Sequence, residues 1–575
     1  MTDQQPAMPL HRTSVAYFSM EIGLQSDIPT YSGGLGILAG DVVRTAADME
    51  VPFVAVTLLP RKGYLHQRLD ASGNQIEESE SWKVQDRLRR LAPRITVVIE
   101  KREVTVRAWQ YDAVGMTGFT VPVLFLDTDL PVNDKKDREL SYYLYGGDNY
   151  YRLCQEYVLG VGGVRMLRTL GYEHIDRFHM NEGHAAFLIL QLIDEELERT
   201  GGKTIRSGHI ESVRRKCIFT THTPVPAGHD KFPMALVRKV IGPHKIWHIE
   251  NQVSGNNGTL NMTYLALNFS HYINGVSKQH GKTSQEMFNS YRIDAITNGV
   301  HAATWTAQPI RKLLDRYIPA WREDNFSIRY ALSVPPEEIW EAHTQCKSKL
   351  ISRVAKEQRA KLDPEAFTIG FARRATAYKR ADLVLRDVDR LKQIADRAGA
   401  FQIVFAGKAH PKDESGKELI KHIFAAKKTL GSDVRIVYLP NYDIDMAKVL
   451  IPGVDLWLNT PLPPHEASGT SGMKAALNGV PSLSILDGWW IEGCVENLTG
   501  WAIGGRSRTR RAKRADTSAK DASAMYDKLE KVIIPMFYDD RERYIRIMRL
   551  AMALNGSFFN TQRMLQEYLL KAYLE

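Results

Sequence analysis

Pro461-Leu-Pro-Pro-His-Glu-Ala-Ser-Gly-Thr-Ser-Gly-Met-Lys474-Ala-Ala-Leu-Asn-Gly479 lies between two short apolar runs, at residues 454–459 and 481–486. The pattern predicts a strand, a glycine-rich turn, a helix that ends at Asn478-Gly479 and a second strand. Small residues before a helix leave its first N–H groups free to bind an anion. Lys474 lies inside the helix among apolar neighbours, where burial would lower its pKa and favour Schiff-base chemistry. Taken alone, the pattern is more typical of a surface lysine beside an ordinary αβ turn.

Regular alternation of strands and helices precedes this stretch. Strands are predicted at residues 367–372, 401–407, 434–439 and 455–459, and helices up to residue 398 and at residues 416–430 and 445–451. Strands that alternate with helices predict a parallel, doubly wound sheet. A long amphipathic helix that reaches about residue 362 comes before the first of these strands, and we place a domain boundary there.

The N-terminal half of the chain shows a similar pattern. A strand at residues 14–21, a glycine-rich turn at 31–41, a helix at 42–49 and a strand at 51–59 predict a βαβ unit. Residues 64–127 predict an antiparallel elaboration, and residues 142–170 predict a helix. A strand at residues 216–220 would present His222 at its carboxyl end, where open α/β sheets bind ligands. A lone histidine at such a place is more often structural.

Length and pattern together indicate an α/β fold with two doubly wound, Rossmann-like domains. The chain has 575 residues, and single hydrophobic cores stop growing at roughly 250–300 residues. The expected division is an N-terminal domain at residues 1–334, a linking helix at 335–364, a C-terminal domain at 365–540 and a terminal helix at 541–575.

Composition and charge exclude several classes of protein. With 44% hydrophobic and 25% charged residues, the chain is globular, and neither a secretory leader nor an apolar run of roughly 20 residues is present. Four scattered cysteines without a CxxC motif indicate a reducing, cytoplasmic location. The net charge of +10 is diffuse apart from residues 506–514, which we interpret as a solvated loop because no nucleic-acid motif accompanies it. The alternative function of the positive charge is to attract anionic metabolites.

His179 and His184 lack carboxylates at ligand spacing, so no metal site is predicted.

The stretch around Lys474 resembles the pyridoxal-phosphate site of the glycogen (α-glucan) phosphorylases, whose loop reads E-A-S-G-T-G-N-M-K. Here Ser471 and Gly472 replace the G-N pair. Nucleotide-sugar glycosyltransferases carry a second glutamate at the position of Lys474. Residues 373–380 resemble the family's K-R-x-x-x-Y-K-R segment, and cations clustered at a helix start make sense if an anion lies between them. The resemblance covers nearly all of residues 14–500 and implies a GT-B fold, in which the two domains face a central cleft.

The resemblance also implies roles for residues at matching motif positions. The implied catalytic residues are Lys474, Lys379, Arg374 and His222. The implied cofactor-binding residues are Lys474, Arg373, Lys379, Thr470, Ser471, Gly34 and Tyr442. The implied substrate-binding residues are Glu466, Ser468, Gly469, Asn298, His222, Tyr378, Leu35 and Gly33. Two positions depart from the family: Asp443 replaces the arginine of an N-Y-R turn, and Gly23 stands where many members carry a tyrosine.

The activity implied by the resemblance is reversible, retaining phosphorolysis of α-1,4-glucan by inorganic phosphate to give α-D-glucose 1-phosphate. The family uses the phosphate of pyridoxal 5'-phosphate, whose second pKa of about 6 suits acid–base work at neutral pH. The chain is short compared with the animal and plant members, so we expect it to lack their long N-terminal regulatory region and predict no phosphorylation or nucleotide control of their kind. The alternatives are a nucleotide-sugar-dependent glucosyltransferase, similar to glycogen synthase, and a catalytically silent glucan-binding protein. Glucan length and oligomeric state stay open, with a homo-oligomer as one option.

Overall fold

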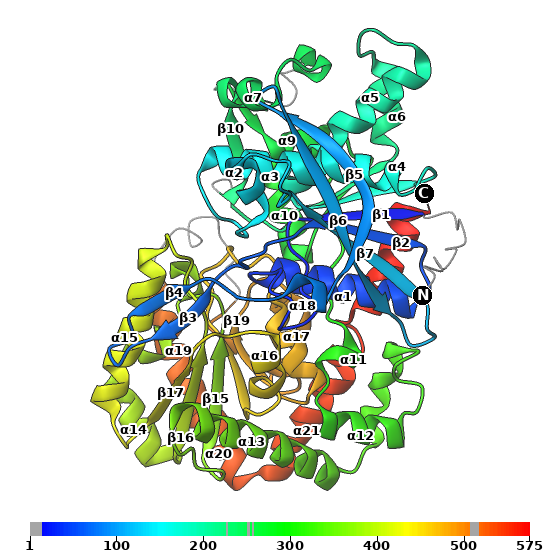
Figure 1. The fold of residues 1–575 in the computed structure, drawn as a ribbon. Coiled ribbons are helices and arrows are strands. Elements are labelled where there is room, and N and C mark those ends of the chain that lie inside the picture. The colour runs from blue at the N-terminus through cyan, green and yellow to red at the C-terminus, as the bar shows by residue number, and fades with distance from the viewer. Residues whose placement is uncertain (1–13, 226–227, 250–253, 256–257, 506–516, 575) are drawn as a thin grey trace, which may run out of the picture.

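The computed structural model describes residues 14–225, 228–249, 254–255, 258–505 and 517–574, so the basic run at residues 506–514 lies outside the described residues. Two large, mainly parallel β-sheets are each covered by helices, the first above the second in Figure 1. The prediction of parallel α/β sheets is confirmed. Within the described residues, no helix is both long enough and apolar enough to cross a bilayer.

The first sheet has nine strands in the order β14-β13-β9-β8-β1-β2-β7-β6-β5. Its strands pair in parallel from β14 to β7, whereas β6 pairs antiparallel with both β7 and β5. The antiparallel part lies at residues 64–127, where it was predicted. The bounds are β1 (Val15–Ser19), β2 (Phe53–Leu58), β5 (Arg89–Ile99), β6 (Arg102–Val114), β7 (Thr120–Asp127), β8 (Arg177–Asn181), β9 (Cys217–Thr220), β13 (Tyr272–Gly275) and β14 (Asp294–Ala295).

The second sheet has six parallel strands in the order β17-β16-β15-β18-β19-β20. The chain moves outward from β15 to β17, returns to β18 and then continues in the other direction. Such sheets bind ligands at the strand carboxyl ends where the order reverses, which here means the ends of β15 and β18. The bounds are β15 (Phe367–Ala372), β16 (Phe401–Ala406), β17 (Arg435–Leu439), β18 (Leu456–Asn459), β19 (Ser482–Ile485) and β20 (Gly500–Ile503).

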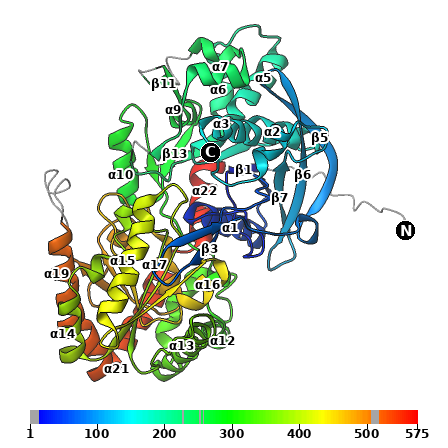
Figure 2. The same cartoon turned by 60° about the vertical axis from the view of Figure 1, so that its left-hand side comes forward.

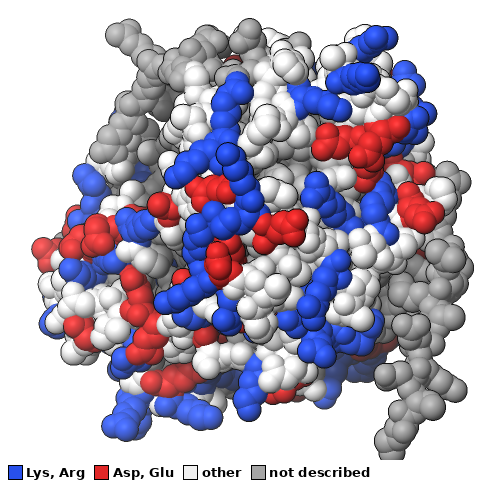
Figure 3. All heavy atoms as spheres, turned by 45° about the horizontal axis from the view of Figure 1, so that its top comes forward, with Lys and Arg blue, Asp and Glu red and all other residues white. Residues whose placement is uncertain are grey.

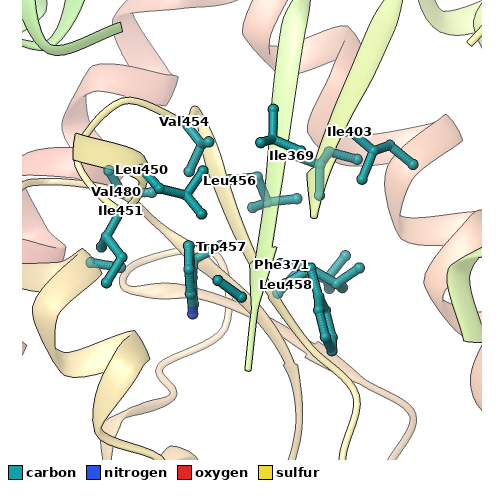
Figure 4. Close-up of a cluster of buried hydrophobic side chains, with 14 of the residues drawn as sticks. Ile369, Phe371, Ile403, Leu450, Ile451, Val454, Leu456, Trp457, Leu458 and Val480 are labelled. Atoms are coloured by element: carbon teal, nitrogen blue, oxygen red, sulfur yellow. The ribbon is translucent and has the colours of Figure 1, made fainter. Parts of the chain in front are cut away.

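Helices cover both faces of the second sheet (Figure 2). One group contains α14 (Val388–Ala398), α15 (Glu414–Leu430) and α19 (Ser518–Lys528), and the other contains α13 (Pro336–Gln358), α16 (Ile444–Leu450) and α21 (Arg541–Leu550). The strands are fully buried apolar runs, as expected for a sheet with two covered faces. Figure 4 shows part of this core, where Ile369 and Phe371 of β15 lie beside Leu456 and Leu458 of β18.

Helix α1 (Gly34–Asp48) begins eight residues earlier than predicted. The segment expected to be a glycine-rich turn therefore forms the first turns of the helix. The carboxylate of Glu21 accepts hydrogen bonds from the backbone N–H groups of Ser32 (2.5 Å) and Gly33 (3.1 Å), next to the start of this helix. This contact satisfies N–H groups near the helix start, so helical backbone can extend through Gly34 and Gly36.

Other helix boundaries also differ from the prediction. The helix expected between the first two strands, up to residue 398, is interrupted: two 3₁₀ turns (Ala377–Lys379 and Leu383–Leu385) precede α14. The helix expected at residues 142–170 begins only with α3 (Asn149–Tyr157), after Gly146 and Gly147, and continues to the end of α4 (Gly163–Thr169). The helix α13 ends at Gln358 rather than near residue 362.

Two segments join the sheets. The C-terminal helix α22 (Thr561–Tyr568) packs on the first sheet, where the Tyr568 hydroxyl lies 3.0 Å from Thr220 Oγ1 of β9 (Figure 1). The hairpin of β3 (His66–Leu69) and β4 (Gln75–Glu78) reaches the second sheet. There the Gln67 N–H donates to Asn441 Oδ1 at 3.1 Å, and Gln75 Nε2 donates to the Ala409 carbonyl at 3.0 Å.

The described surface does not show one continuous basic area on the face drawn in Figure 3, where lysine and arginine side chains alternate with acidic ones. Among the described residues, cations such as Arg68 and Lys417 form ion pairs with Glu78 and Glu77. The excess of positive charge is thus distributed on this face rather than gathered into a stripe.

Candidate active site

The loops that follow β15 and β18 bring three predicted site residues into contact. Arg373 NH1 and Lys379 Nζ each lie 2.6 Å from Glu466 Oε2, and all three side chains are buried. Burial would raise the pKa of Glu466, but the two cations outweigh it and lower that pKa to about 2. The site therefore holds an ionised carboxylate and two cations, with a net positive charge that suits an anionic ligand.

Local structure holds these loops together. Arg380 has a left-handed backbone (φ 46°), and its guanidinium donates to the carbonyls of Thr460 and Pro461, both at 2.9 Å. Gly469 (φ 89°) lies against Glu466, since a Cβ at Gly469 would be 3.3 Å from Glu466 Cγ. The Ser468 Oγ is buried without a hydrogen-bond partner among the described residues. That atom is available to a ligand.

Helix α17 (Thr470–Leu477) follows directly, so its N-terminus lies beside the Glu466 cluster. Ser471 and Gly472, which replace the G-N pair of the family's loop, each have a structural reason. Ser471 Oγ accepts a hydrogen bond from Trp457 Nε1 at 3.1 Å. A Cβ at Gly472 would lie 2.7 Å from the Trp489 ring, so this ring leaves room only for glycine.

Lys474 is buried in α17, as predicted, with 7% of its surface exposed. Its Nζ lies 3.5 Å from the ring centre of Trp305, the last residue of α11 (Ala302–Trp305). Burial lowers the pKa of Lys474 to about 8, and the Asp41 carboxylate of α1 acts in the opposite direction. Asp41 itself accepts a hydrogen bond from Trp305 Nε1 at 2.7 Å. Lys474 thus lies between the two sheets and has a larger neutral fraction near pH 7 than an ordinary lysine, and the neutral amine is the form that reacts with carbonyl groups.

His222 follows β9, where it was predicted. Its Nε2 lies 2.6 Å from Asn181 Oδ1, and its backbone N–H donates to Glu182 Oε2 at 2.8 Å. Burial lowers the pKa of His222 to about 4, although Glu182 opposes this shift. The ring is therefore neutral at pH 7. Because an amide oxygen accepts hydrogen bonds, Nε2 carries the proton and Nδ1 is the acceptor.

The remaining predicted residues make no direct hydrogen bond to Glu466 within the described residues. Arg374 is exposed; desolvation lowers its pKa, but Tyr378, Tyr64 and Glu21 raise it more. Asn298 Oδ1 is buried without a partner among the described residues. Three others lie at the first turn of α1, namely Gly33 as its N-cap followed by Gly34 and Leu35. Lys379 Nζ lies 4.6 Å from the ring centre of Tyr378, and Tyr442 is partly buried, where burial raises the pKa of its hydroxyl and the charge of Arg373 opposes this larger effect.

Contacts between the loops of the two sheets close the site. Ser277 Oγ donates to the Ala467 carbonyl at 2.7 Å, next to Glu466. Thr297 Oγ1 donates to Glu492 at 2.8 Å.

Asp443, which stands where the family has an arginine, caps α16 by accepting a hydrogen bond from the Met446 N–H at 2.7 Å. The aspartate thus has a local structural function that an arginine would not supply.

Cavities elsewhere do not coincide with this cluster. The larger one, of about 910 Å³, lies between the β3–β4 turn, the end of α15 and the edge strand β17, and no predicted site residue lines it. A small one of about 10 Å³ lies under His222 and is lined also by Asn181, Thr220 and Tyr568. Within the described residues, no group of three or more metal-ligating side chains is present.

Comparison with known proteins shows what the chain is similar to along most of its length. The family model described as carbohydrate phosphorylase matches residues 245–533. The maltodextrin phosphorylase of Thermococcus litoralis is 40% identical over 98% of this chain and 71% of its own length. This chain belongs to the carbohydrate phosphorylase family. Two further family members are the glycogen phosphorylases of Mycobacterium tuberculosis, 36% identical over 97% of this chain and 70% of that protein, and of Aquifex aeolicus, 35% identical over 98% and 86%.

Sequence reasoning missed four residues of this carbohydrate phosphorylase site. Glu21 and Asp487 lie two residues beyond the ends of strands β1 and β19, so their place near strand carboxyl ends was a usable signal. Asp41 and Trp305 gave no signal, because the Asp41 charge that acts on Lys474 and the Trp305 ring that contacts it come from parts of the chain that are distant in sequence.

Proposed function

We propose that this protein is an α-glucan phosphorylase that reversibly cleaves α-1,4-glucan with inorganic phosphate, giving α-D-glucose 1-phosphate with retention of configuration. The names and coverage of its relatives support this activity. The observation that carries it is Lys474, a buried amine with a lowered pKa, one helical turn from the start of α17 and close to the Glu466 cluster. A nucleotide-sugar transferase would need a carboxylate at that position.

The proposed architecture is a GT-B fold with two Rossmann-like domains that face a central cleft. We assign residues 1–334 to the first domain, 335–364 to the linking helix, 365–540 to the second domain and 541–575 to a terminal segment. The two separate sheets and the packing of α22 on the first sheet support this division. So do the contacts between loops at the strand carboxyl ends, such as Ser277 with Ala467.

The residues around Lys474 fit pyridoxal 5'-phosphate as a cofactor. Thr470 and Lys474 are four positions apart on α17 and therefore share one face of the helix. A group anchored at Lys474 would meet the helix N-terminus, which favours phosphate. Arg373 and Lys379 supply positive charge there, with Ser471, Gly34 and Tyr442 as further contacts. When bound, the cofactor supplies a phosphate that exchanges a proton with the substrate phosphate.

The chain's own side chains bind and orient the substrates. Glu466 is held ionised and can accept hydrogen bonds from glucosyl hydroxyls, beside Ser468 and Gly469. The free Nδ1 of neutral His222 accepts another, and Asn298, with its unpartnered buried oxygen, adds a further polar contact. Arg374 and Lys379 hold the substrate phosphate against the departing or attacking oxygen, where their charge stabilises the transition state. Tyr378, Leu35 and Gly33 line the same region.

The test is release of glucose 1-phosphate from maltodextrin or glycogen. We expect release only with inorganic phosphate present, together with the near-ultraviolet absorbance of bound cofactor. Sugar transfer from a nucleotide sugar without phosphate dependence would instead support the glucosyltransferase. Glucan binding without either reaction would support the silent protein. Phosphate-dependent release by the purified chain would exclude both.

A further inference from the structure

Asp487 is a neighbour of Glu466, the carboxylate that we propose binds the glucosyl unit. It follows β19, the strand next to β18, and only 3% of its surface is exposed. Its Oδ2 accepts the backbone N–H of Glu466 at 2.9 Å, and its Oδ1 accepts the N–H of Gly488 at 3.0 Å. Each carboxylate oxygen of Asp487 thus accepts a hydrogen bond from a backbone N–H group, and one of these two N–H groups belongs to Glu466.

The residues after Asp487 hold the same loop from the same side. The Trp489 N–H donates to the Ser468 carbonyl at 2.9 Å. Gly488 has a left-handed backbone (φ 53°), and a Cβ there would lie 2.4 Å from the Ser468 oxygen and 3.0 Å from the Glu466 oxygen. Residues 487–489 therefore follow the backbone of residues 466–468 so closely that no side chain fits at Gly488.

The cations of the site do not engage Asp487. Arg373 and Lys379 form their ion pairs with Glu466, and no ion pair of Asp487 occurs within the described residues. Burial raises the pKa of Asp487 to about 7, and the Glu466 carboxylate adds to this rise while Lys379 opposes it. Glu466 and Lys379 are the charged groups that face Asp487. Burial of a carboxylate without an ion-pair partner is unfavourable. The hydrogen bonds that Asp487 does accept come from backbone N–H groups, so its function is to hold the backbone in place.

We propose that Asp487 is a positioning residue for glucosyl binding, whose carboxylate fixes the Glu466 backbone so that the Glu466 side chain meets both the cations and the sugar hydroxyls. This inference rests on the proposed phosphorylase activity. It deepens that activity by adding a residue that touches neither the phosphate nor the sugar. Lys474 lies on α17 and is not contacted by Asp487, so cofactor binding should not depend on it.

The test compares Asp487→Asn with Gly488→Ala. Asparagine has nearly the same shape as aspartate, but its NH₂ group cannot accept a hydrogen bond. One of the two backbone N–H groups, of Glu466 or of Gly488, therefore loses its acceptor. Alanine at Gly488 leaves the carboxylate intact and displaces the loop by contact. Glu496→Gln is the control, because Glu496 is an exposed carboxylate that accepts from the Ala502 N–H. Inhibition by α-D-glucose, a neutral probe of the glucosyl site, and the KM for orthophosphate are measured for each.

We expect the glucose inhibition constant to rise roughly tenfold in Asp487→Asn, as for a lost buried hydrogen bond. It should rise in Gly488→Ala as well, because the added methyl group displaces the loop of residues 466–468. Cofactor content and the KM for orthophosphate should stay within about twofold of the unmodified protein, and the control should match it throughout. Wild-type glucose inhibition should weaken as pH falls through about 7, since protonation of Asp487 disturbs the same contact, whereas Asp487→Asn should show a flat profile. A merely structural role would lower cofactor content as well.

An unchanged glucose inhibition constant in both variants would overturn the inference while leaving the phosphorylase activity in place. A parallel loss of cofactor and of both substrates would overturn it as well, because the effect would then be general. Failure of the unmodified protein to release glucose 1-phosphate overturns the proposed function itself, and the inference with it.

Discussion

Lys379 Nζ and Arg373 NH1 approach the same oxygen of Glu466, each at 2.6 Å. The carboxylate therefore neutralises one of two cations that would otherwise repel each other in a buried place. Removing one member of such a buried cluster leaves uncompensated charge, which is why the arrangement is sensitive to substitution. The charge left over is positive and is available to phosphate.

Replacing Lys379 by methionine should reduce phosphorolysis strongly. The change nearly keeps the side-chain length but removes one cation of the proposed phosphate site. Charged hydrogen bonds contribute about 1.5–3 kcal/mol, so kcat/KM should fall by about 10²-fold. Lys417→Met is the matched control, because Lys417 pairs with Glu77 and Glu414 away from the site. Phosphate-dependent release of glucose 1-phosphate measures the effect. A kcat/KM for Lys379→Met as high as that of the control would disprove the role of Lys379.

Gly472→Ala should destabilise the protein by about 1–3 kcal/mol, because the added methyl group overpacks the buried Trp489 ring. The matched control is Gly208→Ala in α6 (Ser207–Arg214), where a Cβ meets nothing within 4 Å. There the same change should be neutral or stabilising by up to about 1 kcal/mol, since alanine is the better helix former. Urea unfolding measures both. Equal effects of the two substitutions would mean that Trp489 does not restrict Gly472.

His179 should make stability depend on pH. Burial lowers its pKa from 6.5 to about 3, so the folded protein keeps it neutral while the unfolded chain binds a proton below pH 6.5. Stability from this group is thus complete above pH 6.5 and is lost as pH falls towards 3. His179→Asn should reduce the slope of unfolding free energy against pH between about 4 and 6 by about 1.4 kcal/mol per pH unit. His174→Asn, at an exposed position, is the control, and identical slopes in the two variants would contradict this account.

Reconstitution of the cofactor-free protein with pyridoxal 5'-phosphate should accelerate as pH rises through about 8. The pKa of Lys474 is lowered to about 8 by burial, so its neutral, reactive form increases over this range. Between about pH 6.5 and about 8.5 the rate should rise at least about tenfold. Absorbance of the bound cofactor follows the reaction without an activity assay. A rate independent of pH would show that another step or another group governs binding.

Much of the second sheet could be predicted from sequence. The strand at residues 367–372 is observed with those bounds, and the next three strands differ by one residue at an end, because short apolar runs bounded by turn residues have one obvious place in a buried parallel sheet. The loops were harder. The helix after β15 is interrupted because Arg380 turns into a left-handed conformation to reach the carbonyls of Thr460 and Pro461, 80 residues away.

The same distinction applies to the site. Glu466, Arg373 and Lys379 were predicted and are in contact, and the burial of Lys474 was also predicted. The early start of α1 could not be predicted, because it depends on the hydrogen bonds that Glu21 accepts from Ser32 and Gly33 across a turn. Contacts between distant segments, such as Trp305 on Lys474, leave no periodic pattern in either segment. Local sequence thus indicates which groups are present, and the tertiary fold decides which of them meet.

The most direct test of the central claim is reduction of the purified protein with borohydride, followed by peptide mapping. We predict one pyridoxal phosphate per chain, attached to the peptide that contains Lys474. We also predict that Lys474→Ala carries no cofactor and releases no glucose 1-phosphate. Colourless protein that cannot be reconstituted, together with full phosphorolysis by Lys474→Ala, would contradict the account.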